Sequence, residues 1–304
     1  MADLQVNLCG VTLKNPIVTA SGTFGFGEEY GKFFDLNQLG GVAVKGLTPT
    51  ERQGNPAPRI AETPSGILNC VGLQNPGIDR FITEQLPRLR QYDTKIIANV
   101  SGNTVQEYES MVEKISDTSV DLIEVNISCP NVKCGGMAFG TRTDMVEEIV
   151  SAAKAKAKKP LIIKLSPNVT DIVEIARAAV AAGADALSLI NTLLGMRIDI
   201  ETRKPILSNI MGGLSGPAVF PIAVRMVYQV RKAVDVPIIG MGGIQSGQDV
   251  VEMLLAGADA VAIGTAMFAD PMAPIHALSE LEDWMDAHGV KTVRELSGAV
   301  EVNI

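Results

Sequence analysis

The sequence predicts a (β/α)8 barrel, because short apolar runs recur along the chain and helical stretches separate many of them. An apolar run bounded by turn residues is typical of a strand buried on both faces, and such strands form parallel sheets covered by helices. Eight such units favour a closed barrel over an open, doubly wound sheet. The predicted strands are 16–20, 41–45, 95–100, 122–126, 161–165, 186–191, 237–240 and 260–264.

Two segments interrupt the alternation of strands and helices. Residues 4–13 have the pattern of a small hairpin, which is expected to close the bottom of the barrel. Residues 48–76 form a long insertion, rich in proline and glycine, after the second strand. This insertion is a candidate cover for an active site.

The predicted helices have apolar residues spaced by three and four positions. The phrase Ala-Gly-Ala-Asp-Ala occurs twice, at 182–186 and 256–260, and each time its glycine is expected to stop a helix before a strand. Similar local turns explain the repeat without an internal duplication. The helices are expected at 105–115, 143–157, 171–181, 219–233 and 247–256.

Composition narrows the class of protein. With 304 residues and 46% hydrophobic content the chain can bury a large core, and one domain over residues 1–304 is expected. A formal net charge of -8 argues against nucleic-acid binding. The N-terminus does not resemble a signal sequence, and no apolar segment reaches the roughly 18 residues of a membrane span. A soluble, cytoplasmic protein without a membrane partner is therefore predicted.

The four cysteines, Cys9, Cys70, Cys129 and Cys134, do not have the paired spacing of a zinc site, and two histidines add no ligand cluster. No metal site is expected. The spacing does not suit an iron–sulfur centre either, so any such cluster would belong to another chain. Reduced thiols in a cytosolic protein are the simplest interpretation.

Polar side chains stand at the carboxyl ends of the predicted strands, which in a barrel form the reaction face. Asparagine often turns a chain and lysine often extends outward from an apolar strand, so each residue alone has a structural explanation. Their coincidence on one face indicates a shared ligand instead. These residues are Ser21, Lys45, Asn99, Asn126, Lys164, Asn191 and Thr192.

Glycine-rich turns follow the last two predicted strands, at 240–244 and 263–266. Barrels often bind phosphate at this position through backbone N–H groups. Lys45 and Lys164 suit negative charge on an enolate, a carboxylate or a reduced flavin, and amides suit a ligand with paired donors and acceptors. A phosphate-bearing flavin beside a pyrimidine meets these requirements.

Cys129 follows the strand at 122–126 and precedes Pro130, which cannot continue a central strand. The thiol is therefore expected on a loop, to which Gly135 and Gly136 add backbone freedom. An isolated Cys-Pro is more often a buried structural cysteine. The polar ends of the neighbouring strands favour a catalytic thiol.

Together these motifs resemble the dihydroorotate dehydrogenase family, and in particular its class 1B catalytic subunits, over essentially the whole chain. The resemblance implies oxidation of dihydroorotate to orotate by bound FMN in pyrimidine biosynthesis. It rests on residues 19–25 (Thr-Ala-Ser-Gly-Thr-Phe-Gly), 44–48 (Val-Lys-Gly-Leu-Thr), 69–77 (Asn-Cys-Val-Gly-Leu-Gln-Asn-Pro-Gly), 126–131 (Asn-Ile-Ser-Cys-Pro-Asn) and the two late glycine motifs.

The resemblance also implies roles for individual residues. Cys129 would be the general base that removes the C5 proton while C6 delivers hydride to flavin N5. Cys134 inherits no role. The expected FMN contacts are Ser21, Lys45, Gly46, Asn99, Asn126, Lys164, Ile190, Gly216, Gly242, Gly243, Gly264 and Thr265. The expected substrate contacts are Lys45, Asn69, Cys70, Val71, Gly72, Leu73, Asn126, Asn191 and Thr192.

The subtype follows from the loop after the fourth strand. Val132 and Lys133 before the glycine pair resemble class 1B, whereas class 2 enzymes use serine as the base. Class 1B implies a partner subunit with FAD and a 2Fe–2S cluster, in a heterotetramer built on a homodimer, that passes electrons to NAD⁺. The alternatives are a fumarate-using class 1A enzyme, another flavin-dependent dihydropyrimidine oxidoreductase, a flavin-free barrel lyase or synthase, and a binding or scaffold subunit.

Overall fold

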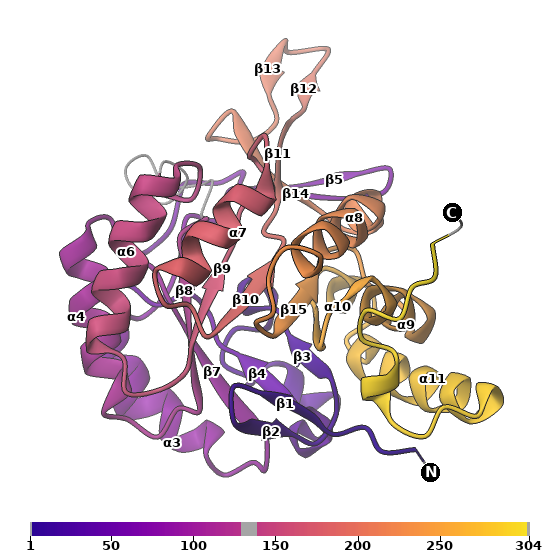
Figure 1. The fold of residues 1–304 in the computed structure, drawn as a ribbon. Helices are drawn as coiled ribbons and strands as arrows, with labels where there is room; N and C mark the ends of the chain where they lie inside the picture. Colours follow the sequence, from indigo (N-terminus) through magenta and orange to yellow (C-terminus); the bar gives the residue numbers. More distant parts are fainter. Residues whose placement is uncertain (1, 129–138, 303–304) are drawn as a thin grey trace.

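A computed structural model describes residues 2–128 and 139–302. Eight parallel strands form a closed barrel in the order β3, β4, β7, β8, β9, β10, β15, β16, and β16 pairs with β3 to complete the circle (Figure 1). Their positions confirm all eight predicted strands. The barrel strands are β3 (Ile17–Thr19), β4 (Gly41–Ala43), β7 (Lys95–Val100), β8 (Leu122–Asn126), β9 (Leu161–Lys164), β10 (Ala186–Leu189), β15 (Ile238–Met241) and β16 (Ala260–Ile263).

Helices surround the barrel, with α4, α6 and α7 on one side in Figure 1 and α8, α9 and α11 on the other. The five predicted helices are confirmed to within two residues at each end. The helices are α1 (Ser21–Phe24), α2 (Ile78–Arg80), α3 (Leu86–Leu89), α4 (Val105–Ser116), α6 (Thr143–Lys156), α7 (Ile172–Ala181), α8 (Phe220–Arg231), α9 (Gly247–Ala256), α10 (Ala266–Ala269) and α11 (Ala273–His288). Short 3-10 turns lie at Tyr30–Lys32, Leu36–Gln38, Pro217–Val219 and Val293–Glu295, and Phe81–Gln85 is a π-helical turn.

The repeated Ala-Gly-Ala-Asp-Ala phrase has a structural role at the amino-terminal ends of the strands. Gly183 (φ 108°) and Gly257 (φ 125°) adopt backbone angles that favour glycine and end α7 and α9. The aspartate that follows each glycine accepts a hydrogen bond from the first N–H of a neighbouring strand. Asp185 Oδ2 accepts from Leu161 N at 2.8 Å, and Asp259 Oδ2 accepts from Ile238 N at 2.8 Å.

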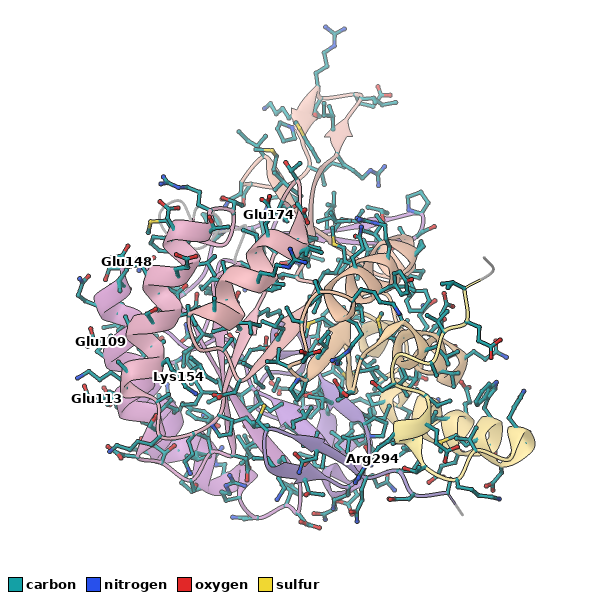
Figure 2. The ribbon with its side chains drawn as sticks, viewed as in Figure 1. Glu109, Glu113, Glu148, Lys154, Glu174 and Arg294 are labelled. Carbon is teal, nitrogen blue, oxygen red and sulfur yellow. The ribbon has the colours of Figure 1, made fainter. Side chains whose placement is uncertain are left out.

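Each of these aspartates also pairs with a cation from a surrounding helix. Lys154 of α6, labelled in Figure 2, lies 2.6 Å from Asp185, and Arg231 of α8 pairs with Asp259. Asp121 repeats the pattern: it accepts from Ile96 N at 2.8 Å and pairs with Arg90 at 2.6 Å. The start of a strand is thus tied to a neighbouring strand at three places, and to a helix or the residue that caps one, at the end of the barrel that usually carries stability.

The predicted N-terminal hairpin is confirmed as β1 (Val6–Leu8) and β2 (Val11–Leu13). Leu8 and Leu13 are fully buried in the main core. In Figure 1 the hairpin lies at the end of the molecule opposite β11 (Leu193–Met196) and β14 (Met211–Ser215).

The insertion after the second barrel strand contributes β5 (Ile60–Thr63) and β6 (Gly66–Asn69) to a second, antiparallel sheet. A later excursion, between β10 and α8, supplies β11 (Leu193–Met196) and β14 (Met211–Ser215), and the order is β11-β14-β6-β5. Its outer part is a projecting arm, β12 (Ile198–Asp199) and β13 (Lys204–Pro205) (Figure 1). The sequence did not predict these six strands, because they are short and mostly not fully buried and lack a long apolar run.

Among the residues described, no helix is both long enough and apolar enough to cross a membrane. Organisation of residues 1–304 as one domain and a cytoplasmic location remain predictions.

Candidate active site

A cavity with about 1140 Å³ of empty space, part of it open to solvent, lies at the carboxyl ends of the barrel strands. Ile60 and Ile67 of the second sheet line it together with the strand ends, so the insertion does cover the mouth. Most residues expected to contact a cofactor line this cavity. They are Ser21, Lys45, Gly46, Asn99, Asn126, Lys164, Ile190, Gly242, Gly243 and Gly264.

The other two expected cofactor residues, Gly216 and Thr265, line an adjoining hollow that shares Gly243 and Phe268 with the main cavity. The expected substrate residues are also brought to the main cavity, with one exception. Asn69, Val71, Gly72, Leu73, Asn191 and Thr192 line it beside Lys45 and Asn126.

Cys70 is the exception. It is fully buried and packs with Leu68 and Leu207 in a small separate core, and its Sγ lies 3.9 Å from Ser208 Oγ. Asn69 and Val71 line the cavity, and side chains alternate between the two faces of an extended segment. Residues 69–73 therefore reach the cavity, but the Cys70 thiol points away from it.

Cys129, the expected base, and Cys134 lie outside the described residues. Ser128, which directly precedes Cys129, is buried and held by two asparagines. Its N–H and Oγ–H donate to Asn126 Oδ1 at 3.1 and 2.9 Å, and Asn191 Nδ2 donates to Ser128 Oγ at 2.7 Å. The ends of β8 and β10 are thereby joined at the edge of the cavity.

Hydrogen bonds fix the backbone beside these amides as well. The carbonyl oxygen of Asn126 accepts from the buried Tyr108 hydroxyl at 2.8 Å. Asn191 Oδ1 accepts from Thr192 N at 2.8 Å, and the Thr192 carbonyl accepts from Asn168 Nδ2 at 3.0 Å. A ligand would meet polar groups that are already oriented, which lowers the cost of binding.

Two lysines bring positive charge to the cavity from separate parts of the barrel, Lys45 from the segment after β4 and Lys164 from the end of β9. Lys164 is only 5% exposed and lies beside Asn126 in the β8–β9 pairing. The ion pairs among the described residues do not include it. Lys45 is half-buried, and its Nζ donates to the Gly22 carbonyl at 3.2 Å. A buried cation such as Lys164 favours an anionic or electron-rich ligand.

Asn99 tests whether the site fits a flavin. Its side chain is fully buried; Nδ2 donates to Glu124 Oε2, while Oδ1 has no partner among the described residues. A buried acceptor without a donor is costly, and a ligand N–H would satisfy it. The residues present therefore fit a planar ring with an N–H donor, as in FMN.

The glycine-rich turns supply the second test. Gly216 (φ 104°) and Gly243 (φ 81°) have angles that favour glycine, and a Cβ on Gly243 would lie 2.8 Å from the Gly216 carbonyl oxygen. Thr265 Oγ1 of the adjoining hollow donates to Ser215 Oγ of the main cavity at 2.8 Å. Such close backbone approach suits a phosphate held by N–H groups. This fits the phosphate end of FMN.

Sequence reasoning missed Glu124, which joins Asn99 to Ser188 beneath the cavity, and Ser215 and Phe268, which line it. The signal for Glu124 was available. It is a charged residue inside an apolar strand, two positions before Asn126 and so on the same face.

Comparisons with known proteins agree with this geometry. The sequence profile of a family described as Dihydroorotate dehydrogenase matches residues 3–285. A relative from Alkaliphilus metalliredigens (strain QYMF), named "Dihydroorotate dehydrogenase B (NAD(+)), catalytic subunit", is 60% identical over 298 residues, 98% of this chain and 99% of the relative. A relative with the same name from Bacteroides fragilis (strain YCH46) is 55% identical over 303 residues, 99% of this chain and 100% of the relative.

The fold is shared with a solved structure of lower identity. The crystal structure of DHODH in complex with ferulenol from Eimeria tenella aligns with a TM-score of 0.80 at 24% identity, covering 98% of this chain and 88% of that chain. The TIM-barrel fold predicted from the sequence is confirmed.

Proposed function

The chain belongs to the dihydroorotate dehydrogenase family, and on this basis we propose that it uses FMN to oxidise (S)-dihydroorotate to orotate in the biosynthesis of pyrimidines. The observation that carries the proposal is the pairing, in one cavity, of an unsatisfied buried acceptor, Asn99 Oδ1, with the buried cation Lys164. A flavin ring provides both an N–H donor and a region that becomes negative on reduction.

The proposed FMN site follows the carboxyl ends of the strands. Asn99 and Lys164 hold the ring, and Gly216, Gly243 and Thr265 hold the phosphate. When bound, FMN supplies the acceptor for the hydride from C6 of dihydroorotate. The remaining proposed contacts are Ser21, Lys45, Gly46, Asn126, Ile190, Gly242 and Gly264.

The substrate is proposed to lie between the ring and the covering sheet. Asn69, Asn126 and Asn191 have amide groups that suit the donors and acceptors of the pyrimidine ring, and Thr192 adds a hydroxyl. Lys45 would neutralise the substrate carboxylate. Val71, Gly72 and Leu73 would complete the wall of the site, and the Cys70 thiol has no part in it.

Cys129 is proposed to remove the proton from C5 as the general base. Loss of this proton, together with hydride from C6, leaves the C5–C6 double bond of orotate, so the substrate gives up two electrons and two hydrogens. Support for the assignment comes from Ser128, the preceding residue, which is bonded to two asparagines at the edge of the cavity. Placement of the base contributes roughly 10² to 10⁴-fold to a rate.

A single-turnover experiment tests this role. We expect Cys129→Ser to retain FMN and to reduce it with dihydroorotate at least about 100-fold more slowly. Cys134→Ala is the matched control, because it removes a thiol five positions later in the sequence, to which no role is assigned. Reduction at the wild-type rate in Cys129→Ser would remove Cys129 from the mechanism, and loss of reduction in Cys134→Ala alone would reverse the assignment.

The electrons are proposed to pass to NAD⁺ through a partner subunit that carries FAD and a 2Fe–2S cluster, in a heterotetramer built on a homodimer. The support is the name of the relatives, which are catalytic subunits of an NAD⁺ enzyme. The test is to assay dihydroorotate oxidation with NAD⁺ and with fumarate, with and without co-purified chains. Efficient fumarate reduction by this chain alone would contradict the NAD⁺ assignment.

A further inference from the structure

Glu124 is a buried carboxylate beneath the cavity with no role in the proposed chemistry. It is 2% exposed and lies on β8, on the same strand face as Asn126, which lines the cavity two residues later. No ion pair among the described residues includes it. A buried acidic group without a cation is costly and is retained where its hydrogen bonds serve a purpose.

The two carboxylate oxygens of Glu124 are both satisfied by donors. Ser188 Oγ, on β10, donates to Oε1 at 2.6 Å, and Asn99 Nδ2, on β7, donates to Oε2. An ionised carboxylate can only accept, so the amide of Asn99 must present its nitrogen to Glu124. The other end of the amide, Oδ1, is therefore forced to point away from the carboxylate.

Gly46, which follows the neighbouring strand β4, has no side chain that would crowd Asn99 Oδ1. A Cβ at position 46 would lie 2.9 Å from Asn99 Oδ1. Both Gly46 and Asn99 line the cavity, and Oδ1 has no partner among the described residues. The oxygen is thus buried and oriented, and its residue belongs to the wall of the cavity in which a ligand would lie.

We propose that Glu124 is a positioning residue that locks the Asn99 amide so that Oδ1 accepts a hydrogen bond from a ring N–H of the flavin. This inference rests on the proposed use of FMN. Oxidised isoalloxazine has a single N–H, at N3, so N3 is the donor that the geometry requires. If Glu124 only linked β7 to β10, its hydrogen bonds to Asn99 and Ser188 would be sufficient. It would then not matter whether the Asn99 amide turned its oxygen or its nitrogen toward the cavity.

The test measures FMN binding to the flavin-free full chain by fluorescence quenching. Glutamine at 124 has the same shape but offers a donor as well as an acceptor, so the Asn99 amide can turn around. We expect Glu124→Gln to weaken FMN binding about 3- to 10-fold, the effect of one hydrogen bond, and to shift the absorption of bound flavin. Glu148→Gln, on the exposed outer side of α6 (Figure 2), is the matched control.

A double variant separates orientation from packing. In Asn99→Asp with Glu124→Gln the hydrogen bond runs in the opposite direction, from Gln Nε2 to Asp, and an acceptor again faces the cavity. We expect FMN affinity to recover to within about threefold of wild type. Weak binding by Glu124→Gln that the double variant does not improve would show a packing or charge effect and overturn the proposal.

A flavin analogue tests the same contact without any mutation. N3-methyl-FMN cannot donate at N3, and we expect the wild-type chain to bind it at least about tenfold more weakly than FMN. Equal affinities, or unchanged FMN affinity and spectrum in Glu124→Gln, would overturn the role of Glu124. Failure of the wild-type chain to bind FMN at all would instead contradict the proposed function.

Discussion

Replacing Gly46 by alanine tests how the mouth of the barrel accepts its ligand. The added Cβ would lie 2.9 Å from Asn99 Oδ1 and 3.1 Å from Leu73 Cδ2. Leu73 Cδ2 is the end of a side chain and can move, whereas the Asn99 amide is held by Glu124. The methyl group therefore fills the approach to the oxygen, in a backbone conformation that alanine adopts without strain.

The expected effect combines a lost hydrogen bond with local overpacking. One hydrogen bond contributes about 0.5 to 1.5 kcal/mol, and overpacking costs about 1 to 3 kcal/mol. In the flavin-free chain, movement of the Leu73 side chain relieves part of the overpacking. A loss of about 1.5 to 3 kcal/mol in FMN binding corresponds to a dissociation constant about 10 to 150 times higher. The melting temperature of the flavin-free chain should fall by only a few degrees.

Titration of the flavin-free chain with FMN, followed by quenching, measures this effect. Gly41→Ala is the control, because Gly41 lies in β4, five positions before Gly46, and a Cβ there would meet its nearest atom, the Lys95 carbonyl oxygen, at 3.4 Å. We expect its affinity to stay within about twofold of wild type. Gly46→Ala that binds FMN as tightly as Gly41→Ala would refute the idea that a ligand reaches Asn99 through this space.

Three further predictions concern single residues. Burial, together with the charge of Asp185, raises the pKa of the Cys9 thiol to about 11. Iodoacetamide at pH 8 should therefore alkylate Cys9 about 100-fold more slowly than an ordinary thiol, and the rate should increase as the pH rises. Mass spectrometry of the digested protein measures the labelling, and fast labelling of Cys9 at pH 8 would contradict the prediction. Asp259→Asn should lower the melting temperature by about 2 to 6 °C through loss of its charged hydrogen bonds, whereas a change in FMN affinity would contradict its placement away from the site. Lys164→Gln should weaken FMN binding about 10- to 100-fold, as expected for a buried charged contact; FMN affinity equal to wild type in the same titration would remove Lys164 from the cofactor site.

The barrel could be predicted from the sequence because its strands are buried on both faces and read as apolar runs. The second sheet could not, because β6 pairs with β14, about 145 positions later in the chain, and neither strand has a continuous apolar pattern. Strand ends could be assigned to one face from topology alone, since parallel strands share a carboxyl edge. This reasoning brought Asn99, Asn126 and Lys164 together correctly.

Side-chain direction was harder to predict than position. The 69–73 segment lies at the cavity as expected, but Cys70 packs into the small core with Leu68 and Leu207, on the face opposite to that of Asn69 and Val71. Glu124 was overlooked because a carboxylate in an apolar strand has no obvious partner in the sequence. Its partners, Asn99 and Ser188, come from strands 25 and 64 residues away.

The two ends of the barrel satisfy their polar groups in different ways. At the amino-terminal end, Asp121, Asp185 and Asp259 each meet a strand N–H and a cation from the same chain, so this end needs no ligand to be complete. At the carboxyl end, the chain orients Asn99 through Glu124 and leaves its oxygen without a partner. An unsatisfied buried acceptor raises the free energy of the ligand-free protein. A ligand that donates a hydrogen bond to this acceptor removes the penalty and therefore binds more tightly. The two ends therefore depend on different residues: the aspartates and their cations stabilise the amino-terminal end, whereas the unpaired Asn99 oxygen costs stability at the carboxyl end and favours a ligand that donates to it.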